Sequence, residues 1–343
     1  MIELLQQLIS IPSVSKDEGA ACNFLQSYLS GLGMEVHRCG NNLWVESEPA
    51  GAKPTILLNA HIDTVKPVSS YSRDPFRPAV EGDRLYGLGS NDDGASLVAL
   101  LETYRRLVAA GQPYRLVYSA TAEEEVSGSG GLELVFPHIG RIDFGIIGEP
   151  TGMRMALAEK GLMVLDCKSS GKSGHAAREE GENAIYKAFS DIDWFRHYRF
   201  EKESEFCGPV KMTVTQIESG TQHNVIPDSC SFVVDVRSNG RYSNEEILEE
   251  VKRNVSCEVK ARSTRLKGSF LEASHPAVER GLRMGLEGFG SPTLSNQALC
   301  GFPTMKIGPG DSSRSHTADE YVLVSELEKA PDIYFELLNG LKI

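Results

Sequence analysis

Residues 56–63 read ILLNAHID, an apolar strand-like run that ends in His61 and Asp63. Other apolar runs also lead to acidic or histidine side chains, namely LYGLGSND (85–92) to Asp92, RLVYSATAEEE (115–125) to Glu124 and Glu125, DFGIIGEP (143–150) to Glu149, and KIGPGDSSRSH (306–316) to His316. In an open α/β sheet, ligands bind outside the carboxyl ends of the strands. We therefore expect these oxygen and imidazole donors to meet at one sheet edge, as a cage for divalent cations.

Composition and charge limit the possible classes of protein. The chain has 343 residues, of which 41% are hydrophobic and 24% charged, as in ordinary globular proteins. This length predicts two domains. The net charge of -12 argues against a nucleic-acid or membrane partner, because binding to phosphate groups needs a basic face.

The cysteines and the N-terminal stretch bear on the cellular compartment. Seven dispersed cysteines without a C-x-x-C pair predict reduced thiols in a cytoplasmic protein. The stretch MIELLQQLISIP lacks a basic start and a long apolar run, so we expect no signal peptide. No apolar run approaches the roughly 20 residues that a membrane span needs.

The two ends of the chain predict one α/β domain, covering 1–160 and 272–343. Apolar periodicity and strand-like runs predict helices at 17–32, 95–109, 276–288 and 325–339, and strands at 42–47, 55–60, 115–120, 143–147 and 304–307. Alternating helices and strands are typical of a mostly parallel sheet that helices cover on both faces. We expect the metal-binding, catalytic function to lie in this domain.

The middle of the chain, 161–271, has a different pattern. It predicts a strand at 162–168, a helix at 182–198, strands at 210–217 and 230–237, a helix from Asn244 as its cap to 253, and a strand at 258–263. This βαββαβ order is that of a ferredoxin-like α+β domain. We expect it to be inserted into the larger domain.

Each polar motif also has a plain structural interpretation. The pair His61 and Asp63 suits a metal ligand with its orienting carboxylate, but a lone H-x-D is more often a solvated loop. Asp92 and Asp93 precede a helix and would cap it, although a carboxylate with two oxygens also bridges two cations. Glu149 alone fits an ordinary turn.

Glu123, Glu124 and Glu125 form a run that would usually be solvated. Here the run follows an apolar strand and precedes SGSGG, which lets the backbone approach a site. One glutamate would then bind metal while its neighbour acts as a base. His316 follows GPG in a polar stretch, where a lone histidine is usually just exposed.

Taken together, the motifs carry a resemblance that none carries alone. AHIDTV, LYGLGSND, TAEEE, IIGEPT, SGKSGHAA and SHTADEYV resemble, in order and over nearly the whole chain, the co-catalytic zinc peptidase and deacylase family. The resemblance implies that His61 and Glu149 bind one zinc, that Glu125 and His316 bind another, and that Asp92 bridges the two. Relatives often have D-x-K-G where this chain has DDGA, so Asp93 stays an alternative bridge.

The resemblance implies further roles and a homodimer formed through the inserted domain. Asp63 would orient His61, and Glu124 would be the general base. His175 would reach the neighbouring subunit's site and stabilise the oxyanion, although relatives often have H-S-x-x-P where this chain has HAAR. Asn224 and Arg237 match substrate-binding positions, and a strand-end salt bridge is the plain alternative for Arg237.

The expected substrate is an N-acyl-L-amino acid. The motifs are most similar to the acetylornithine deacetylase branch of the family, which serves arginine biosynthesis, and N-succinyl-ornithine, N-succinyl-diaminopimelate and small peptides are the alternatives. Backbone amides of Gly308 and Gly310 would approach the substrate. The mixed oxygen and nitrogen ligand set suits two Zn²⁺ per subunit, with Co²⁺ or Mn²⁺ as substitutes.

Rival classes are less compatible with the sequence. The GKSG stretch lacks the earlier glycine of a P-loop, because Asp166 stands there, and no G-x-S-x-G of a serine hydrolase occurs. A metal-binding protein without turnover stays an alternative. Such a protein would have no need of the acid at Glu124.

Overall fold

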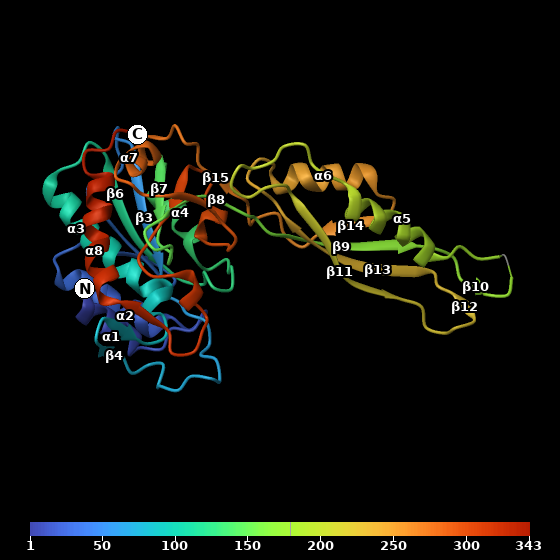
Figure 1. Cartoon of the computed structure of the whole chain (residues 1–343), viewed down its shortest axis with the longest axis horizontal. Helices are drawn as coiled ribbons and strands as arrows, with labels where there is room; N and C mark the ends of the chain where they lie inside the picture. Colours follow the sequence, from blue (N-terminus) through green and yellow to red (C-terminus); the bar gives the residue numbers. More distant parts are fainter. Residues whose placement is uncertain (179) are drawn as a thin grey trace. The chain divides into compact units, whose positions relative to one another are not determined.

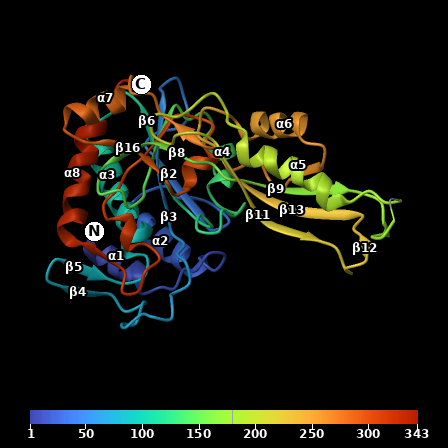
Figure 2. The ribbon, with the colours of Figure 1, turned by 45° about the vertical axis from the view of Figure 1, so that its right-hand side comes forward.

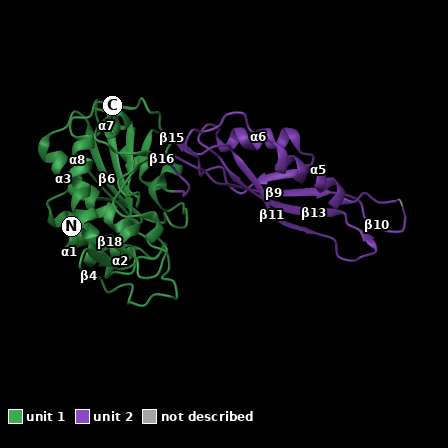
Figure 3. Ribbon diagram, viewed as in Figure 1, with its two compact units in different colours: residues 1–157, 271–289, 295–343 green, residues 158–270, 290–294 purple. Residues whose placement is uncertain are grey.

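A mixed β-sheet forms the centre of the larger part of the molecule in the computed structural model, which describes residues 1–178 and 180–343 (Figure 1). The chain divides into two compact units (Figure 3). Unit 1 comprises 1–157, 271–289 and 295–343, and unit 2 comprises 158–270 and 290–294. The sequence predicts 290–294 as part of the larger domain, whereas the structure groups these residues with unit 2.

The four central strands of this sheet are parallel, which confirms the predicted α/β class. In sheet order these strands are β6 (Arg115–Thr121), β3 (Thr55–His61), β7 (Phe144–Ile147) and β17 (Thr304–Lys306). Every residue of these four strands is buried, as expected for parallel strands covered on both faces. Their carboxyl ends therefore lie at one edge.

Antiparallel strands extend the sheet on both sides. On the β6 side lie β2 (Asn42–Glu46) and β1 (His37–Cys39), and on the β17 side lie β8 (Met155–Glu159) and β15 (Ser269–Phe270). Strand β16 (Gly288–Ser291) also pairs with β8. Strand β16 stands where the sequence predicted the end of a helix, since α7 (Pro276–Arg283) stops earlier. Strand β8 was not predicted.

Helices cover both faces of the sheet. Neighbouring residues of a strand point to opposite faces, so a single strand contacts elements on each side. On β6, the Tyr118 hydroxyl donates to the Leu97 carbonyl of α3 (Ala95–Ala110), which packs against α8 (Val324–Leu338). Val117 instead packs against Leu132 on the other face, beside α4 (Phe136–Ile139). Two N-terminal helices, α1 (Ile2–Ile9) and α2 (Gly19–Gly31), complete unit 1.

A small three-stranded sheet links two distant parts of unit 1. Its strands are β4 (Ala79–Glu81), β5 (Arg84–Tyr86) and β18 (Tyr321–Leu323), with β5 in the middle. The register pairs Tyr86 with Tyr321. The residues after β5, which lead to Asp92, therefore lie beside the residues before β18, which follow His316.

Unit 2 has the βαββαβ order. Its elements are β9 (Met163–Ser170), α5 (Ala184–His197), β11 (Lys211–Ser219), β13 (Ser229–Arg237), α6 (Asn244–Asn254) and β14 (Glu258–Ala261). The antiparallel sheet has the order β11-β13-β9-β14, and both helices cover one face (Figure 2). Ser243, not Asn244 as predicted, caps α6, because the Asn244 side chain is buried and bonds to Thr264 and Leu266.

A short ribbon of two strands, β10 (Gly174–His175) and β12 (Val225–Ile226), extends from unit 2. In the part of the chain that the structure describes, no helix is long and apolar enough to cross a membrane.

Candidate metal centre

The acidic and histidine side chains singled out in the sequence follow the four parallel strands of unit 1. His61 is the last residue of β3, Glu124 and Glu125 follow β6, Glu149 follows β7, and His316 lies beyond β17. Asp92 comes from the loop that precedes α3. Because the carboxyl ends of parallel neighbours share one edge, the fold brings these residues together.

His61 presents one ring nitrogen to this cluster. Its Nδ1 lies 2.8 Å from the Asp63 carbonyl oxygen, which can only accept, so Nδ1 carries the proton. Its Nε2 lies 3.2 Å from Asp92 Oδ1 and 3.8 Å from Glu124 Oε2. Burial lowers the pKa of His61, but the hydrogen bonds to Asp63 and Asp92 outweigh burial and raise this pKa well above its ordinary value. In the neutral ring, the same nitrogen would be free to bind a cation.

Asp92 lies between the two imidazoles. Its Oδ1 faces His61, and its Oδ2 lies 3.7 Å from His316 Nε2. The same His316 nitrogen is 2.9 Å from Glu125 Oε2. Asp93, joined to Asp92 by a cis peptide bond, is 1% exposed and turns both oxygens into the protein, so among the two aspartates only Asp92 faces both histidines.

Potential ligand atoms form two groups, within 4.8 Å of one another in each. One group comprises His61, Asp92 and Glu125, and the other comprises His61, Glu124 and Glu149. Both groups share His61, whereas the sequence analysis assigns Glu125 and His61 to different ions. Glu125 also touches His316, so it lies near both imidazoles.

The three consecutive glutamates point in different directions. The Asp63 carboxylate accepts the backbone N–H groups of Glu124 at 3.0 Å and Glu125 at 3.1 Å, and the Ser15 hydroxyl at 2.7 Å. Glu123 turns away, and its carboxylate accepts the Gly130 N–H at 3.2 Å. Only Glu124 and Glu125 therefore enter the cluster.

Asp63 lies beside His61 and contacts it through two groups. Its backbone carbonyl oxygen is 2.8 Å from His61 Nδ1, and its carboxylate Oδ1 is 3.4 Å from the same nitrogen. The same carboxylate also fixes the backbone of the glutamate pair. A side chain that bonds to residues sixty positions away gives no local signal in the sequence.

Burial makes these carboxylates hard to ionise. Burial raises the pKa of Glu124 to about 8, with the charges of Glu125 and Asp92 adding to the effect. Burial and the Asp92 charge likewise raise the pKa of Glu149 well above its usual range. The hydrogen bond to Glu125 raises the pKa of His316 to about 9.

A divalent cation fits this set of donors. Four carboxylates crowd around two imidazoles in a buried place, and burial together with the neighbouring negative charges raises the pKa of the three glutamates. Carboxylate oxygen and imidazole nitrogen are ordinary ligands of zinc and related ions. The cluster is therefore chemically suited to hold metal.

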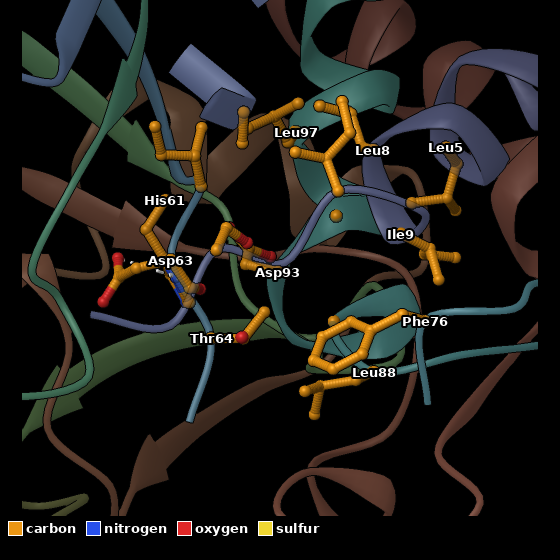
Figure 4. Close-up of a pocket in the computed structure, with 16 residues that line it drawn as sticks. Leu5, Leu8, Ile9, His61, Asp63, Thr64, Phe76, Leu88, Asp93 and Leu97 are labelled. Carbon is orange, nitrogen blue, oxygen red and sulfur yellow. Dashed lines mark hydrogen bonds and ion pairs between the residues drawn. The ribbon is translucent and has the colours of Figure 1, made fainter. Parts of the chain in front are cut away.

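An apolar pocket lies directly behind His61 (Figure 4). Leu5 and Ile9 of α1 face Phe76 and Leu88 there, and His61, Asp63, Thr64 and Asp93 form its polar end. The N-terminal helix, which the sequence analysis did not predict, thus supports the back of the cluster.

Two of the remaining predicted site residues are neighbours in unit 2. His175 pairs with Val225 across the β10–β12 ribbon, and the Asn224 carbonyl accepts the Ala176 N–H at 3.0 Å. Arg237 lies at the far end of β13, where its guanidinium bonds to both oxygens of Asp235 at 2.8 and 3.0 Å. The plain interpretation of Arg237, a strand-end salt bridge, describes this contact.

The two loop glycines serve close packing. The Gly308 N–H donates to the Thr151 hydroxyl at 3.1 Å, so this amide is engaged within the protein, in contrast to its expected approach to substrate. A Cβ on Gly308 would lie 2.5 Å from the Glu149 carbonyl oxygen. On Gly310, whose φ is +90°, it would lie 2.4 Å from Asn91 Oδ1.

Two residues that hold the Asp92 loop were missed in the sequence. Asn91 and Glu320 both bond to backbone groups around Asp92 or His316. Asn91 stands inside the motif LYGLGSND, and Glu320 stands inside SHTADEYV. A polar side chain in the same motif as a predicted ligand is therefore the sequence signal that could have identified them.

Comparison with known proteins identifies the family. The model of "Peptidase family M20/M25/M40" matches residues 57–340. This chain belongs to that family, whose members are metal-dependent hydrolases of amide bonds.

Individual relatives extend over the whole chain. Acetylornithine deacetylase of Proteus mirabilis is 26% identical over 99% of this chain and 96% of its own, and succinyl-diaminopimelate desuccinylase of Delftia acidovorans is 24% identical over 99% and 98%. The crystal structure of aminopeptidase PepT from Bacillus cereus shares the fold with a TM-score of 0.76 at 20% identity, covering 98% of this chain and 97% of that one. The Bacillus subtilis YXEP protein, described as a dinuclear metal binding peptidase, has a TM-score of 0.69 at 17% identity, covering 98% and 96%.

The metal-free protein is expected to lose stability as pH rises. Glu124 has its pKa raised from 4.5 to about 8, and His316 from 6.5 to about 9. The folded state therefore binds more protons than the unfolded state across this range, and the free energy of unfolding falls with pH. Thermal unfolding of chelator-treated protein should show a melting temperature that decreases between about pH 5.5 and about pH 8.5.

Zinc should act in the opposite direction, because cations and protons compete for the same carboxylates. Its stabilising effect should grow over the same pH interval. A melting temperature that rises with pH in the metal-free protein, or a zinc effect independent of pH, would contradict the assignment of the cluster.

Proposed function

We propose that this chain is an amidohydrolase with a co-catalytic pair of zinc ions, which releases the acyl group from N-acetyl-L-ornithine in arginine biosynthesis. The observation that carries the proposal is the position of Asp92, whose two oxygens face two different imidazoles. Family membership supports the reaction class. The seven dispersed cysteines, which form no C-x-x-C pair, support a cytoplasmic location.

Asp92 would be shared between the two ions, since its oxygens diverge toward His61 and His316. His61 and Glu149 would complete one position, and Glu125 and His316 the other. When bound, two such ions polarise a carbonyl oxygen and acidify water. Zinc suits the ligand set, and Co²⁺ or Mn²⁺ would also fit.

Glu124 is the proposed general base. It belongs to the cluster but lies farther from His61 than Asp92 does, at 3.8 Å compared with 3.2 Å. Asp63 fixes its backbone, and burial raises its pKa to about 8, near the working pH of a base. Glu124 would take the proton of the attacking water and deliver it to the leaving amine.

The choice of substrate is supported by the relatives. One curated relative acts as an acetylornithine deacetylase and another as a succinyl-diaminopimelate desuccinylase. Both names describe an N-acyl amino acid as the substrate. Of the two, we propose N-acetylornithine as the substrate of this chain. N-succinyl substrates and small peptides are the alternatives.

A second copy of the chain is proposed to complete the site. Arg237 ends β13 of the unit 2 sheet, whereas His175 lies in the β10–β12 ribbon beyond the other end of that strand. The eight steps along β13 alone span about 26 Å at roughly 3.3 Å per step. One small substrate cannot touch both in one subunit. If both serve one site, His175 and Asn224 come from the partner subunit. Arg237 would then release Asp235 and bind the carboxylate of the substrate.

The surface of unit 2 is compatible with a homodimer. Strand β11 is an edge strand, and edges of this kind tend to pair. Ile217 on β11 is 59% exposed, and Tyr186 and Phe189 on the adjacent helix α5 are 72% and 64% exposed. Burying these apolar groups would stabilise pairing of two unit 2 copies.

A substrate panel tests the proposed reaction. We expect the zinc-loaded protein to hydrolyse N-acetyl-L-ornithine with a kcat/KM at least about tenfold above N-succinyl-diaminopimelate and dipeptides, and chelation to abolish turnover. Preference for a succinyl substrate or a dipeptide would correct the substrate. Zinc binding without hydrolysis of any amide would favour the non-catalytic alternative.

Substitution of the proposed base tests the mechanism. Glu124→Gln should lower kcat by about 10² to 10⁴ while zinc content stays unchanged, because the amide cannot accept the proton. Glu123→Gln is the matched control and should keep its activity, since that side chain faces Gly130. Full activity of Glu124→Gln would remove Glu124 from the mechanism.

Mixed dimers test whether His175 acts across subunits. A purified heterodimer of His175→Ala and Glu124→Gln chains has one site with intact Glu124 and intact His175 only if the histidine comes from the partner. We expect about half of the wild-type rate per dimer, because one of two sites works. No recovery above the homodimeric variants would show that His175 does not act in this way.

A further inference from the structure

Glu320 is a buried acid near the cluster for which the proposed reaction has no role. It is 2% exposed and lies four residues after His316 in the motif SHTADEYV. Its Oε1 accepts the N–H groups of Asn91 at 2.9 Å and Asp92 at 3.0 Å, and its Oε2 accepts the Gly89 N–H at 3.0 Å. One carboxylate thus holds the backbone that carries Asp92.

These bonds satisfy backbone groups that regular structure leaves without partners. Gly89 has a left-handed conformation with a φ of 75°, and Asp92 has non-helical angles inside the short irregular turn Ser90–Gly94. Buried N–H groups need a partner. Glu320 provides three such bonds at once.

The Asp92 loop is also held by Asn91. The Asn91 Oδ1 accepts the Asp311 N–H at 3.0 Å, and its Nδ2 donates to the Asp311 carbonyl at 3.1 Å and to Ser315 Oγ at 3.2 Å. The Gly87 N–H donates to the Glu320 carbonyl at 3.0 Å, next to the β5–β18 pairing. One segment, 311–320, therefore contacts the Asp92 loop at Asp311, Ser315 and Glu320, and it carries His316.

Glu320 is poorly placed to bind metal itself. Both of its oxygens already accept N–H groups of the loop, so they point at backbone rather than at the imidazoles. Its contacts nevertheless fix the position of Asp92 relative to His316. The two side chains are held through one short stretch of chain.

We propose that Glu320 is a positioning residue that sets the geometry of Asp92 between His61 and His316, and so sets the affinity for metal. This inference rests on the proposed function, in which Asp92 is shared by two ions. Partners that orient metal ligands typically change metal affinity or activity by about 10- to 100-fold when they are removed.

Asp319 provides a matched control in the same segment. Its carboxylate accepts the backbone N–H groups of Ser72 at 3.0 Å and Arg73 at 3.1 Å, and also the Ser72 hydroxyl. It therefore anchors a loop by the same kind of bonds, but that loop carries no proposed ligand. Comparing the two residues separates positioning of Asp92 from general stability.

The experiment measures zinc affinity of the metal-free full chain by competition with a chelating dye, for wild type, Glu320→Ala, Glu320→Gln and Asp319→Ala. We expect Glu320→Ala to bind zinc about 10- to 100-fold more weakly and to lower kcat with little change in KM. Asp319→Ala should keep its zinc affinity within about threefold of the wild-type value, even if its melting temperature falls as far as that of Glu320→Ala. Glu320→Gln should be intermediate, because one oxygen still accepts two N–H groups, and it serves if the alanine variant does not fold.

Two outcomes would overturn the inference. Equal zinc affinities for wild type and Glu320→Gln or Glu320→Ala would mean that Glu320 does not position Asp92. An equal loss in Asp319→Ala would assign the effect to stability of the whole segment. Failure of the wild-type protein to bind zinc would instead contradict the proposed function.

Discussion

Crowding of buried carboxylates at one sheet edge is the constraint on which the rest of the molecule depends. Asp92, Glu124, Glu125 and Glu149 meet there around two imidazoles, and burial raises the pKa of Glu124 to about 8. Such an arrangement costs free energy unless positive charge is supplied. Folding therefore has to hold acids together against their repulsion, which explains why so many other bonds surround the cluster.

The supporting bonds are nearly all made by side chains to distant backbone groups. Asp63 holds the two glutamates after β6, Glu123 holds the glycine-rich loop that follows them, and Glu320 holds the loop of Asp92. Each of these acids accepts N–H groups of the backbone. The site thus uses two kinds of carboxylate: those that present oxygens to a cation, and those that fix the first kind in place.

The sequence alone predicts those helices and strands whose residues follow a long, regular apolar pattern. Buried strands such as β3 and β6 are long apolar runs, and the chemistry at their ends pointed to one edge. Short elements were missed or misjudged, because β8 and β16 at the antiparallel side have five and four residues and carry little periodicity. The helix expected at 276–288 instead ends at Arg283, shortly before Gly285, whose φ of +85° is not helical.

Partners of individual side chains were harder to foresee. The sequence suggested that Asp63 orients His61, but whether its carbonyl or its carboxylate makes the bond depends on local geometry. Likewise, Gly308 was expected to offer its amide to substrate, yet Thr151, far away in sequence, takes that N–H. Long-range hydrogen bonds of this kind depend on tertiary packing, which no local pattern encodes.

Anomalous diffraction from crystals grown with zinc tests the account most directly. Two peaks about 3.5–4 Å apart on either side of the Asp92 carboxylate, one beside His61 and one beside His316, are the predicted result. A single ion bound by other residues, or no ion at this edge in protein that hydrolyses its substrate, would contradict it.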